Sequence, residues 1–377
     1  MSTGGRDQAF KDALANYLAP IVEYLEDPAV TEVLINGHEE VFVERSGKLH
    51  KTDKRFDSED ELLAGITAIA NYVGRRITKE DPRLDARLPD GSRIHAVIPP
   101  CARSGPTVAI RKFSQVKVDF KQYIKWGAIS SDAAQFLEIA MFLGKNILVS
   151  GGTGSGKTTL LGLLCSRIPN GQRIIVIEDA SELIIHYEHV VRFETKLADA
   201  QGEGEVGIYD LLKSSLRLRP DRIIVGEVRG SEAFELIQAM NTGHKGCLGT
   251  IHSNSADDAL VRLESLALGA GNVSERALQH SIGSAIDMVI QVSRLRDGSR
   301  RVVSISEVFG TDKDNNYIIK DIFNIPSLTL QSDGSLKGEI KPTGELPSFM
   351  HEIEENRIPY PRSKFLNPAH GTKTKAS

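Results

Sequence analysis

The sequence predicts a two-domain α/β protein, with a small N-terminal α/β domain of antiparallel strands followed by a larger domain of parallel strands. Three observations support this prediction. Short β-rich runs separated by turns fill the first part of the chain, strands alternate with helices from about residue 124, and a glycine-rich motif occupies residues 151–158. At 377 residues the chain is long enough for two or three domains.

The first predicted elements are a helix and a hairpin. Apolar residues recur at helical spacing over residues 8–26, at Phe10, Leu14, Leu18, Ile21 and Leu25. Short strands are predicted at residues 32–35 and 40–43. Because Asn36-Gly37 is a strong turn signal, we expect the two strands to pair as a hairpin.

A second amphipathic helix begins after a capping box at residues 58–61, with its apolar face formed by Leu62, Ile66, Ile69 and Val73. Further short strands are predicted near residues 83–88, 93–98 and 107–110, with a turn at residues 89–92 between the first two. These elements complete a first domain over residues 1–113. Residues 114–123 show no clear periodicity, and we expect them to link the two domains.

The second domain is predicted over residues 124–330, where strands alternate with helices as in a parallel sheet. Its strands are expected near residues 146–150, 173–178, 222–226, 247–251 and 288–293. One helix begins at Ser231 and stops at Gly243. Residues 331–377, rich in Pro, Gly, Ser and charge, are expected to form a partly flexible C-terminal extension that frays from Lys364 onward.

Residues 151–158 match the phosphate-binding pattern G-x-x-x-x-G-K-[ST] between an apolar strand and an apolar helix. In such a P-loop, backbone N–H groups surround phosphate oxygens, and the N-terminus of the helix adds partial positive charge. Lys157 would reach the β- and γ-phosphates, and the Thr158 hydroxyl would bind Mg²⁺. The sequence therefore predicts binding of ATP with Mg²⁺, through Gly151, Gly152, Thr153, Gly154, Ser155, Gly156, Lys157, Thr158 and Thr159.

Acidic residues follow two buried strands. Glu178 and Asp179 come directly after the apolar run 174–177, and Glu227 follows the run 223–226. Ligands of open α/β sheets bind outside the carboxyl ends of the strands, so we expect these carboxylates to face the nucleotide. They would hold the metal and its water shell or polarise the attacking water. The alternative is that Glu178 or Asp179 only caps the next helix.

Two histidines and three arginines are further candidates. His252 follows the strand after that of Glu227, where a neutral imidazole would sense the γ-phosphate, and His244 is a weaker candidate. In the first domain, Arg87, Arg93 and Arg111 lie at strand positions. The sequence leaves two interpretations open for these arginines, namely a solvated surface or contacts to a γ-phosphate.

Composition excludes several classes of protein. The formal net charge of −4 gives no global attraction to nucleic acid or anionic lipid. The first residues lack the apolar stretch of a secretory signal, and no run of about 18 apolar residues occurs, so we expect no membrane span. Cys101, Cys165 and Cys247 form no C-x-x-C pair, which predicts reduced cytoplasmic thiols rather than a zinc site or a disulfide.

Taken in order, these motifs resemble the type II/type IV secretion ATPase superfamily. The resemblance rests on the P-loop, on Ile177-Glu-Asp179, on Leu216-Arg-Leu-Arg-Pro-Asp-Arg-Ile-Ile-Val-Gly-Glu-Val-Arg-Gly230, and on Gly243-His244 with Gly249-Thr-Ile-His-Ser-Asn254. In the first domain it extends to Leu88-Pro-Asp-Gly-Ser-Arg93 and Ile110-Arg-Lys-Phe113, so it covers roughly residues 20–310. The stretch from Met240 through Arg262-Leu-Glu-Ser265 looks most like the CpaF-type branch, which drives Tad (Flp) pilus assembly.

The resemblance implies a RecA-like P-loop domain and a homo-hexameric ring that hydrolyses ATP to drive pilus assembly or secretion. Glu178 would activate water, Glu227 would support Mg²⁺, and His252 would couple nucleotide state to motion. Arg93 and Arg111 would contact the phosphates from the first domain. The protein would be cytoplasmic and peripheral to the inner membrane through a platform protein. The tetracysteine zinc motif of type II secretion and pilus-extension relatives is absent from the sequence.

Three alternatives stay open at this point. A conjugation or type IV secretion ATPase would have the same fold. A hexameric nucleic-acid translocase would also use a P-loop, although the net charge and the lack of a basic patch interleaved with aromatic residues disfavour direct nucleic-acid binding. A nucleotide-gated scaffold with little turnover is disfavoured by the two glutamates at strand ends.

Overall fold

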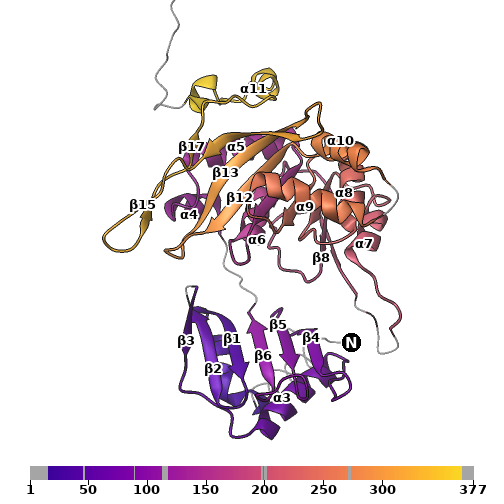
Figure 1. Ribbon diagram of the computed structural model, residues 1–377, viewed down its shortest axis with the longest axis vertical. Coiled ribbons are helices and arrows are strands. Elements are labelled where there is room, and N and C mark those ends of the chain that lie inside the picture. The colour runs from indigo at the N-terminus through magenta and orange to yellow at the C-terminus, as the bar shows by residue number, and fades with distance from the viewer. Residues whose placement is uncertain are drawn as a thin grey trace, which may run out of the picture. The chain divides into compact units, whose positions relative to one another are not determined.

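The computed structural model describes residues 16–45, 47–88, 90–112, 118–196, 198, 202–270 and 273–366. The chain divides into two compact units, residues 1–116 and 117–377 (Figure 1). Phe10, Leu14 and Phe113, together with residues 114–117, lie outside the described residues.

The first unit is one antiparallel sheet with helices. Its strands lie in the order β3-β2-β1-β6-β5-β4. Buried strand residues such as Val33 and Ile94 form one core cluster with Leu62, Ile66 and Ile69 of α3, so this helix covers one face of the sheet. The elements are η1 (Ala19–Ile21), α2 (Val22–Glu26), β1 (Val30–Asn36), β2 (Glu40–Arg45), β3 (Lys48–Lys51), α3 (Glu59–Tyr72), β4 (Arg83–Arg87), β5 (Arg93–Val97) and β6 (Thr107–Arg111).

Two local features that the sequence predicts for this unit, a hairpin and a helix N-cap, are present in the structure. Strands β1 and β2 pair as the predicted hairpin, with Gly37 at a φ of +63° that suits glycine. The predicted N-cap of α3 is present, because the Ser58 hydroxyl accepts from the N–H of Glu61 at 3.2 Å. The return contact differs, since the Glu61 carboxylate accepts from the N–H of Asp57. Strand β3, which is exposed along its length, was not predicted.

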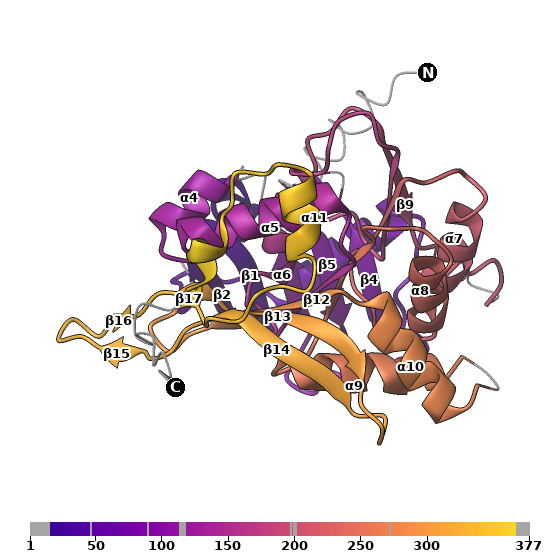
Figure 2. The same cartoon turned by 90° about the horizontal axis from the view of Figure 1, so that it is seen from above.

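The second unit is a sheet covered by helices on both faces (Figure 2). The order is β17-β14-β13-β12-β7-β11-β10-β8-β9, parallel from β12 to β9 and antiparallel from β12 to β17. Its strands are β7 (Ile147–Gly151), β8 (Ile174–Glu178), β9 (Val190–Glu194), β10 (Arg222–Val225), β11 (Leu248–Ile251), β12 (Met288–Arg294), β13 (Arg300–Thr311), β14 (Tyr317–Asn324) and β17 (Lys341–Pro342).

Helices α4, α5 and α6 contribute to the core on one face of this sheet, and α7 to α10 contribute to the core on the other. A two-stranded hairpin of β15 (Thr329–Leu330) and β16 (Leu336–Lys337) follows β14. The helices are α4 (Phe120–Lys125), α5 (Ser131–Leu143), α6 (Lys157–Cys165), α7 (Ile208–Ser215), α8 (Glu232–Asn241), α9 (Ala256–Leu268), α10 (Glu275–Ala285), α11 (Met350–Glu355) and η2 (Arg362–Phe365).

Two expectations need correction. The predicted linker does not extend to residue 123, because α4 begins at Phe120 and both Phe120 and Tyr123 are buried in the core of the second unit. The predicted fraying from Lys364 is also wrong as far as residue 366. Phe365 is fully buried beside Phe136, with ring centroids 5.5 Å apart, and Lys364 bonds to Asp132 at 2.5 Å.

Candidate functional site

The P-loop connects β7 to α6. Its glycines have the backbone conformations that the motif requires, with φ of +69° at Gly154 and +97° at Gly156. A Cβ at Gly151 would lie 2.3 Å from the carbonyl oxygen of Val292 on β12, so only glycine fits there. The loop therefore presents the start of α6 at the carboxyl edge of the parallel sheet, where an N-terminal helix turn favours an anion.

Lys157 is buried, with 7% of its surface exposed, and its ammonium group curls back over the loop. The Nζ atom donates to the carbonyl oxygens of Gly151 and Gly152, at 3.0 Å each. The same atom lies 3.3 Å from Nε2 of His252. The structure thus places this cation in the centre of the loop, next to the residue that follows β11.

His252 lies between Lys157 and Glu227. Its Nε2 atom is 3.4 Å from Oε1 of Glu227, which follows β10. Burial lowers the pKa of His252, and the nearby ammonium of Lys157 lowers it further, while the Glu227 carboxylate opposes both effects. At neutral pH the imidazole is therefore uncharged and has one donor and one acceptor nitrogen.

Backbone contacts between adjacent strands hold Glu227 at this edge. The N–H of Gly226 donates to the carbonyl of Ile177 at 2.8 Å, and the Val228 N–H donates to that of Thr250 at 2.8 Å. The Thr250 hydroxyl donates to the carbonyl of Gly226 at 2.6 Å. Because β8, β10 and β11 are neighbouring parallel strands, their ends meet at one edge of the sheet.

Glu178 lies at the same edge, but its carboxylate faces the backbone that follows β8. Its Oε1 atom accepts from the N–H groups of Glu182 and Leu183, both at 2.8 Å, and its Oε2 atom is 3.8 Å from Nη1 of Arg192. Burial raises the pKa of Glu178, whereas these hydrogen bonds and Arg192 oppose the rise. Glu178 thus holds the loop between β8 and β9. The alternative that it caps the next helix is wrong, because the described element that follows β8 is the strand β9.

Asp179, next to Glu178, forms an ion pair with Arg229 at 2.7 Å between Oδ2 and Nη2. Burial raises the pKa of Asp179, and the Arg229 guanidinium opposes that rise. The two consecutive acids therefore have different partners, and the pair with Arg229 connects the segments that follow β8 and β10.

Two arginines beside the P-loop were missed. Nε of Arg300, the first residue of β13, donates to the carbonyl of Gly154 at 2.8 Å. Nη1 of Arg294, the last residue of β12, lies 3.7 Å from the Cβ position of Gly154. The Asp297-Gly298 pair, with Gly298 at a φ of +83°, was the available signal for this hairpin.

The three candidate arginines of the first unit lie in one row across neighbouring strands. Arg87 of β4 is opposite Arg93 of β5, and Arg93 is opposite Arg111 of β6, which is in turn opposite Glu32 of β1. Directly paired residues share a face of the sheet, and here it is the face turned away from α3, because the alternate residues of these strands are the buried ones. Like charges in such a row repel one another, which favours binding of an anion there.

His244 is not part of the P-loop cluster. It precedes β11, whereas His252 follows it, so the two lie at opposite edges of the sheet. Cys101, Cys165 and Cys247 are free thiols, of which Cys101 is exposed and the other two are buried. Burial raises the pKa of Cys247 to about 12.

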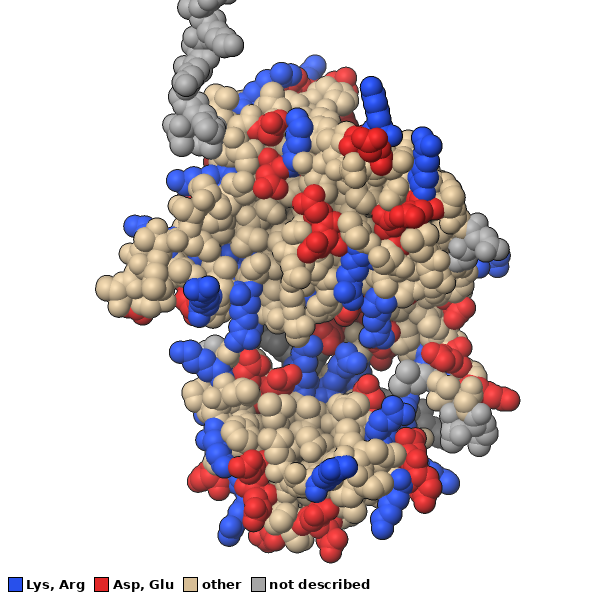
Figure 3. All heavy atoms as spheres, viewed as in Figure 1, with Lys and Arg blue, Asp and Glu red and all other residues tan. Residues whose placement is uncertain are grey.

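On the face seen in Figure 3, basic and acidic side chains are interspersed over both units. Within the described part of the chain, no helix combines the length and the apolar character that crossing a membrane would require.

Comparison with known proteins shows the family. Residues 15–316 match the family described as type II/IV secretion system protein. A putative conjugal transfer protein of Mycobacterium tuberculosis (strain ATCC 25618 / H37Rv) is 35% identical over 299 residues, which cover 78% of this chain and 84% of that protein. The type IV secretion system protein VirB11 of Brucella suis biovar 1 is 33% identical over 319 residues, covering 76% and 88%.

A solved structure shares the fold. The pilus retraction motor PilT, crystallised with bound ADP, superposes with a TM-score of 0.56 at 22% identity, covering 80% of this chain and 84% of that one. This likeness confirms the predicted fold class, an N-terminal α/β unit with antiparallel strands and a C-terminal RecA-like P-loop unit.

Proposed function

Because the chain belongs to the family of type II/IV secretion system proteins, we propose that it is an ATPase that converts ATP hydrolysis into mechanical work. The observation that carries this proposal is the cluster of Lys157, His252 and Glu227 at the P-loop. A cation, a neutral imidazole and a carboxylate from three different elements meet where the terminal phosphate of a bound nucleotide would lie. Such groups stabilise and monitor phosphoryl transfer.

The oxygen ligands at this edge fit Mg²⁺. Thr158 contributes a hydroxyl at the start of α6, and Glu227 contributes a carboxylate. The side chain of Glu227 is 40% exposed, so the carboxylate is accessible to a metal ion. Hard oxygen donors of this kind suit Mg²⁺, which would neutralise charge on the β- and γ-phosphates. We assign Thr158 and Glu227 to the metal, Lys157 to the phosphates, and Glu178 to polarising the attacking water.

The proposed role of His252 is to detect the γ-phosphate. Its imidazole contacts both Lys157 and Glu227, so loss of phosphate would alter its partners. We expect His252→Ala to lower kcat on the order of tenfold while changing ATP affinity less, because a residue that contacts a metal ligand such as Glu227 contributes about 10- to 100-fold to activity. Steady-state kinetics beside ATP and ADP binding will check this. Full activity with unchanged affinities for both nucleotides would assign His252 a structural role.

We further propose that nucleotide draws the first unit onto the second, with Arg93 and Arg111 completing the site. The support is the arginine row on the face of the first sheet that is turned away from α3. A hinge between the units would absorb the backbone change, and differential affinity for ATP and ADP would drive the motion. Within a homo-hexameric ring, such closure would exert a mechanical force on a membrane protein bound to the ring.

Arg93→Ala and Arg111→Ala are each expected to lower ATPase activity by about 10- to 100-fold, since a hydrogen bond to a charged group contributes roughly 1.5–3 kcal/mol. Neither variant should unfold the protein, because partly exposed arginines stabilise little. Distances between fluorescent probes on the two units should shorten with a non-hydrolysable ATP analogue, and less so in the double variant. Equal distances with ATP and ADP would refute the closure.

For the biological process we propose assembly of a Tad (Flp) pilus, at the cytoplasmic side of the inner membrane and through a platform protein. The support is the CpaF-like stretch from Met240 to Ser265. The similarity to a putative conjugal transfer protein favours a second candidate, conjugation or type IV secretion. Deletion of the gene distinguishes the two processes. Loss of pili with normal plasmid transfer supports pilus assembly, whereas loss of plasmid transfer with normal pili supports conjugation or type IV secretion.

A further inference from the structure

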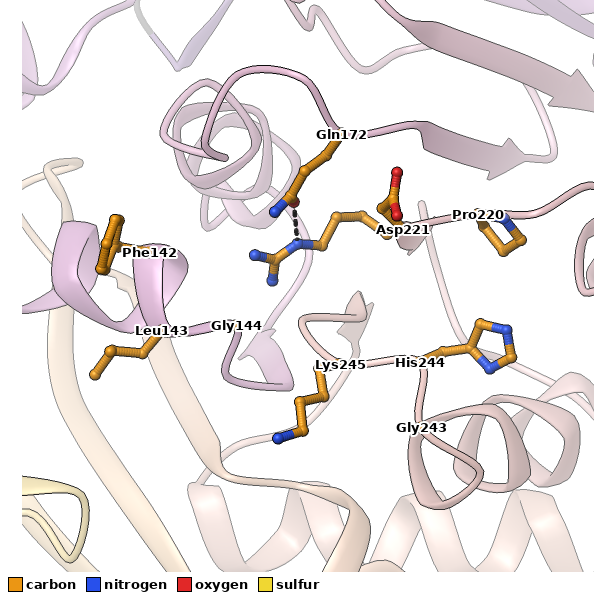
Figure 4. Close-up of a pocket in the computed structure, with 10 residues that line it drawn as sticks. Phe142, Leu143, Gly144, Gln172, Pro220, Asp221, Gly243, His244 and Lys245 are labelled. Atoms are coloured by element: carbon orange, nitrogen blue, oxygen red, sulfur yellow. Dashed lines mark hydrogen bonds between the residues drawn. The ribbon is translucent and has the colours of Figure 1, made fainter. Parts of the chain in front are cut away.

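Four buried side chains in the described part of the chain have a polar atom without a hydrogen-bond partner, namely those of Tyr123, Ser150, Arg222 and Gln291. Arg222, the first residue of β10, lies beside the hollow of Figure 4, at the edge of the sheet opposite the P-loop. Its Nη1 atom is enclosed by backbone, because a Cβ at Gly246 would lie 1.3 Å from it. Ser150 and Gln291, in contrast, lie at the end of the sheet that carries the P-loop.

Gln291 of β12 is paired directly with Ser150 of β7, the residue that precedes the P-loop. Successive residues of a strand point to opposite faces of the sheet. Val289 and Leu148, which lie two residues before Gln291 and Ser150, belong to the core cluster on the face that α9 covers. Gln291 and Ser150 therefore point toward this face, and only 4% of Gln291 is exposed.

The amide of Gln291 makes one long-range contact. Its Nε2 atom donates to the carbonyl oxygen of Ser253 at 3.3 Å, whereas its Oε1 atom has no partner among the described residues. A carbonyl oxygen can only accept, so this contact fixes which end of the amide faces Ser253. Since β7 lies between β12 and β11, the bond spans the strand that leads into the P-loop.

The bond matters for His252, which lies just beyond β11. The last paired residue of this strand is Ile251, so the position of the His252 ring depends on hydrogen bonds that its neighbours in the chain make. Toward β10, the Thr250 hydroxyl donates to the carbonyl of the residue before Glu227 at 2.6 Å. Toward β12, Gln291 holds the residue after His252. The segment that carries His252 is thus held from both sides.

Stability alone does not account for an amide at this position. A buried polar atom without a partner typically costs more free energy than one neutral hydrogen bond contributes. The Gln291 side chain has one such atom and one bond of 3.3 Å. A methionine would fill a similar volume without the unpaired oxygen. The benefit of the amide therefore lies in what its bond positions.

We propose that Gln291 is a positioning residue for ATP hydrolysis, which holds the segment of His252 through its bond to Ser253. The imidazole of His252 then stays between Lys157 and Glu227. This proposal rests on the ATPase function proposed above. Gln291 acts through His252, because its side chain is buried and bonds to the backbone next to that histidine.

Gln291→Met tests the proposal, because methionine has a similar length and no amide. The variant should lower kcat for ATP by about 2- to 10-fold, the effect of one hydrogen bond, with KM and the affinity for Mg·ADP unchanged. Its midpoint of thermal unfolding should not fall. Gln279→Met is the matched control. It removes an amide bond of 3.0 Å from Gln279 of α10 to Glu264 of α9, in the same unit, and its kcat should be normal.

A double-mutant cycle distinguishes positioning from a general effect on the fold. In the His252→Ala background, Gln291→Met should have no further effect on kcat, whereas independent effects would multiply. The proposal is overturned if Gln291→Met has a normal kcat, if its effect multiplies with that of His252→Ala, or if the variant loses its fold.

A spectroscopic measurement separates this proposal from the ATPase function itself. The imidazole NMR signal of His252, identified by its loss in His252→Ala, should shift in Gln291→Met with Mg·ADP bound and stay in place in Gln279→Met. Absence of ATP hydrolysis in the unmodified protein would refute the ATPase function, and the signal would still report whether Gln291 holds the histidine. An unchanged His252 signal in Gln291→Met would overturn the positioning role.

Discussion

Replacement of Lys157 by alanine is expected to abolish measurable ATP hydrolysis. The ammonium belongs to the first residue of α6 and would stabilise the negative charge that develops on the phosphate oxygens during transfer. Removing one such preorganised donor costs about 10²- to 10³-fold in kcat, and loss of a full charge should cost more. Phosphate release from MgATP, compared between the two proteins at equal concentration, will measure the effect.

The variant should still fold. Its two lost hydrogen bonds to Gly151 and Gly152 contribute roughly 1 kcal/mol each, which a domain with a large core tolerates. Lys121→Ala is the control for removal of a lysine from the same unit, and its turnover should be normal. Hydrolysis by Lys157→Ala at more than a tenth of the normal rate would exclude the proposed site.

Glu178→Gln is expected to retain ATP binding and to lose turnover by about 10²- to 10⁴-fold, the usual value of a general base. This substitution removes the basic carboxylate but keeps its structural contacts, because an amide oxygen still accepts hydrogen bonds from the N–H groups of Glu182 and Leu183. The loop after β8 should therefore keep its conformation. Nucleotide affinity measured beside kcat separates the chemical role from a structural one.

The pH dependence adds a second readout. Burial raises the pKa of Glu178, so its ionised form is lost at a higher pH than in an exposed glutamate. As pH falls, turnover should decline through this raised pKa, and the acidic limb should disappear in Glu178→Gln. If that variant has a normal kcat, Glu227 becomes the base, and Glu227→Gln should then show the loss.

Much of the site could be predicted because its parts are short and lie at strand ends. The P-loop is recognisable from eight consecutive residues, and His252 and Glu227 follow apolar runs that neighbour one another in a parallel sheet. The orientation of Glu178 was not predictable, since it depends on N–H groups presented by the segment after β8. Arg300 reaches the P-loop from a hairpin about 150 residues away, a contact that no local pattern encodes.

The C-terminal segment also contains contacts that local sequence patterns do not encode. Phe349, Tyr360 and Phe365 pack around Phe136 of α5, although no helical or strand periodicity relates them. Composition rich in Pro, Gly and charge indicated a loose extension for this region. Tertiary contacts with a preformed hydrophobic surface overrode that local tendency, because burial of large aromatic side chains is a strong driving force.

The most direct test of the account is single-turnover hydrolysis of ATP by the full chain, with Mg²⁺ and with the metal chelated. The account predicts phosphate release that requires Mg²⁺ and falls in parallel in Lys157→Ala and Glu227→Gln, since these residues act at one centre. Tight ATP binding without phosphate release, or release that survives chelation and both substitutions, would contradict it.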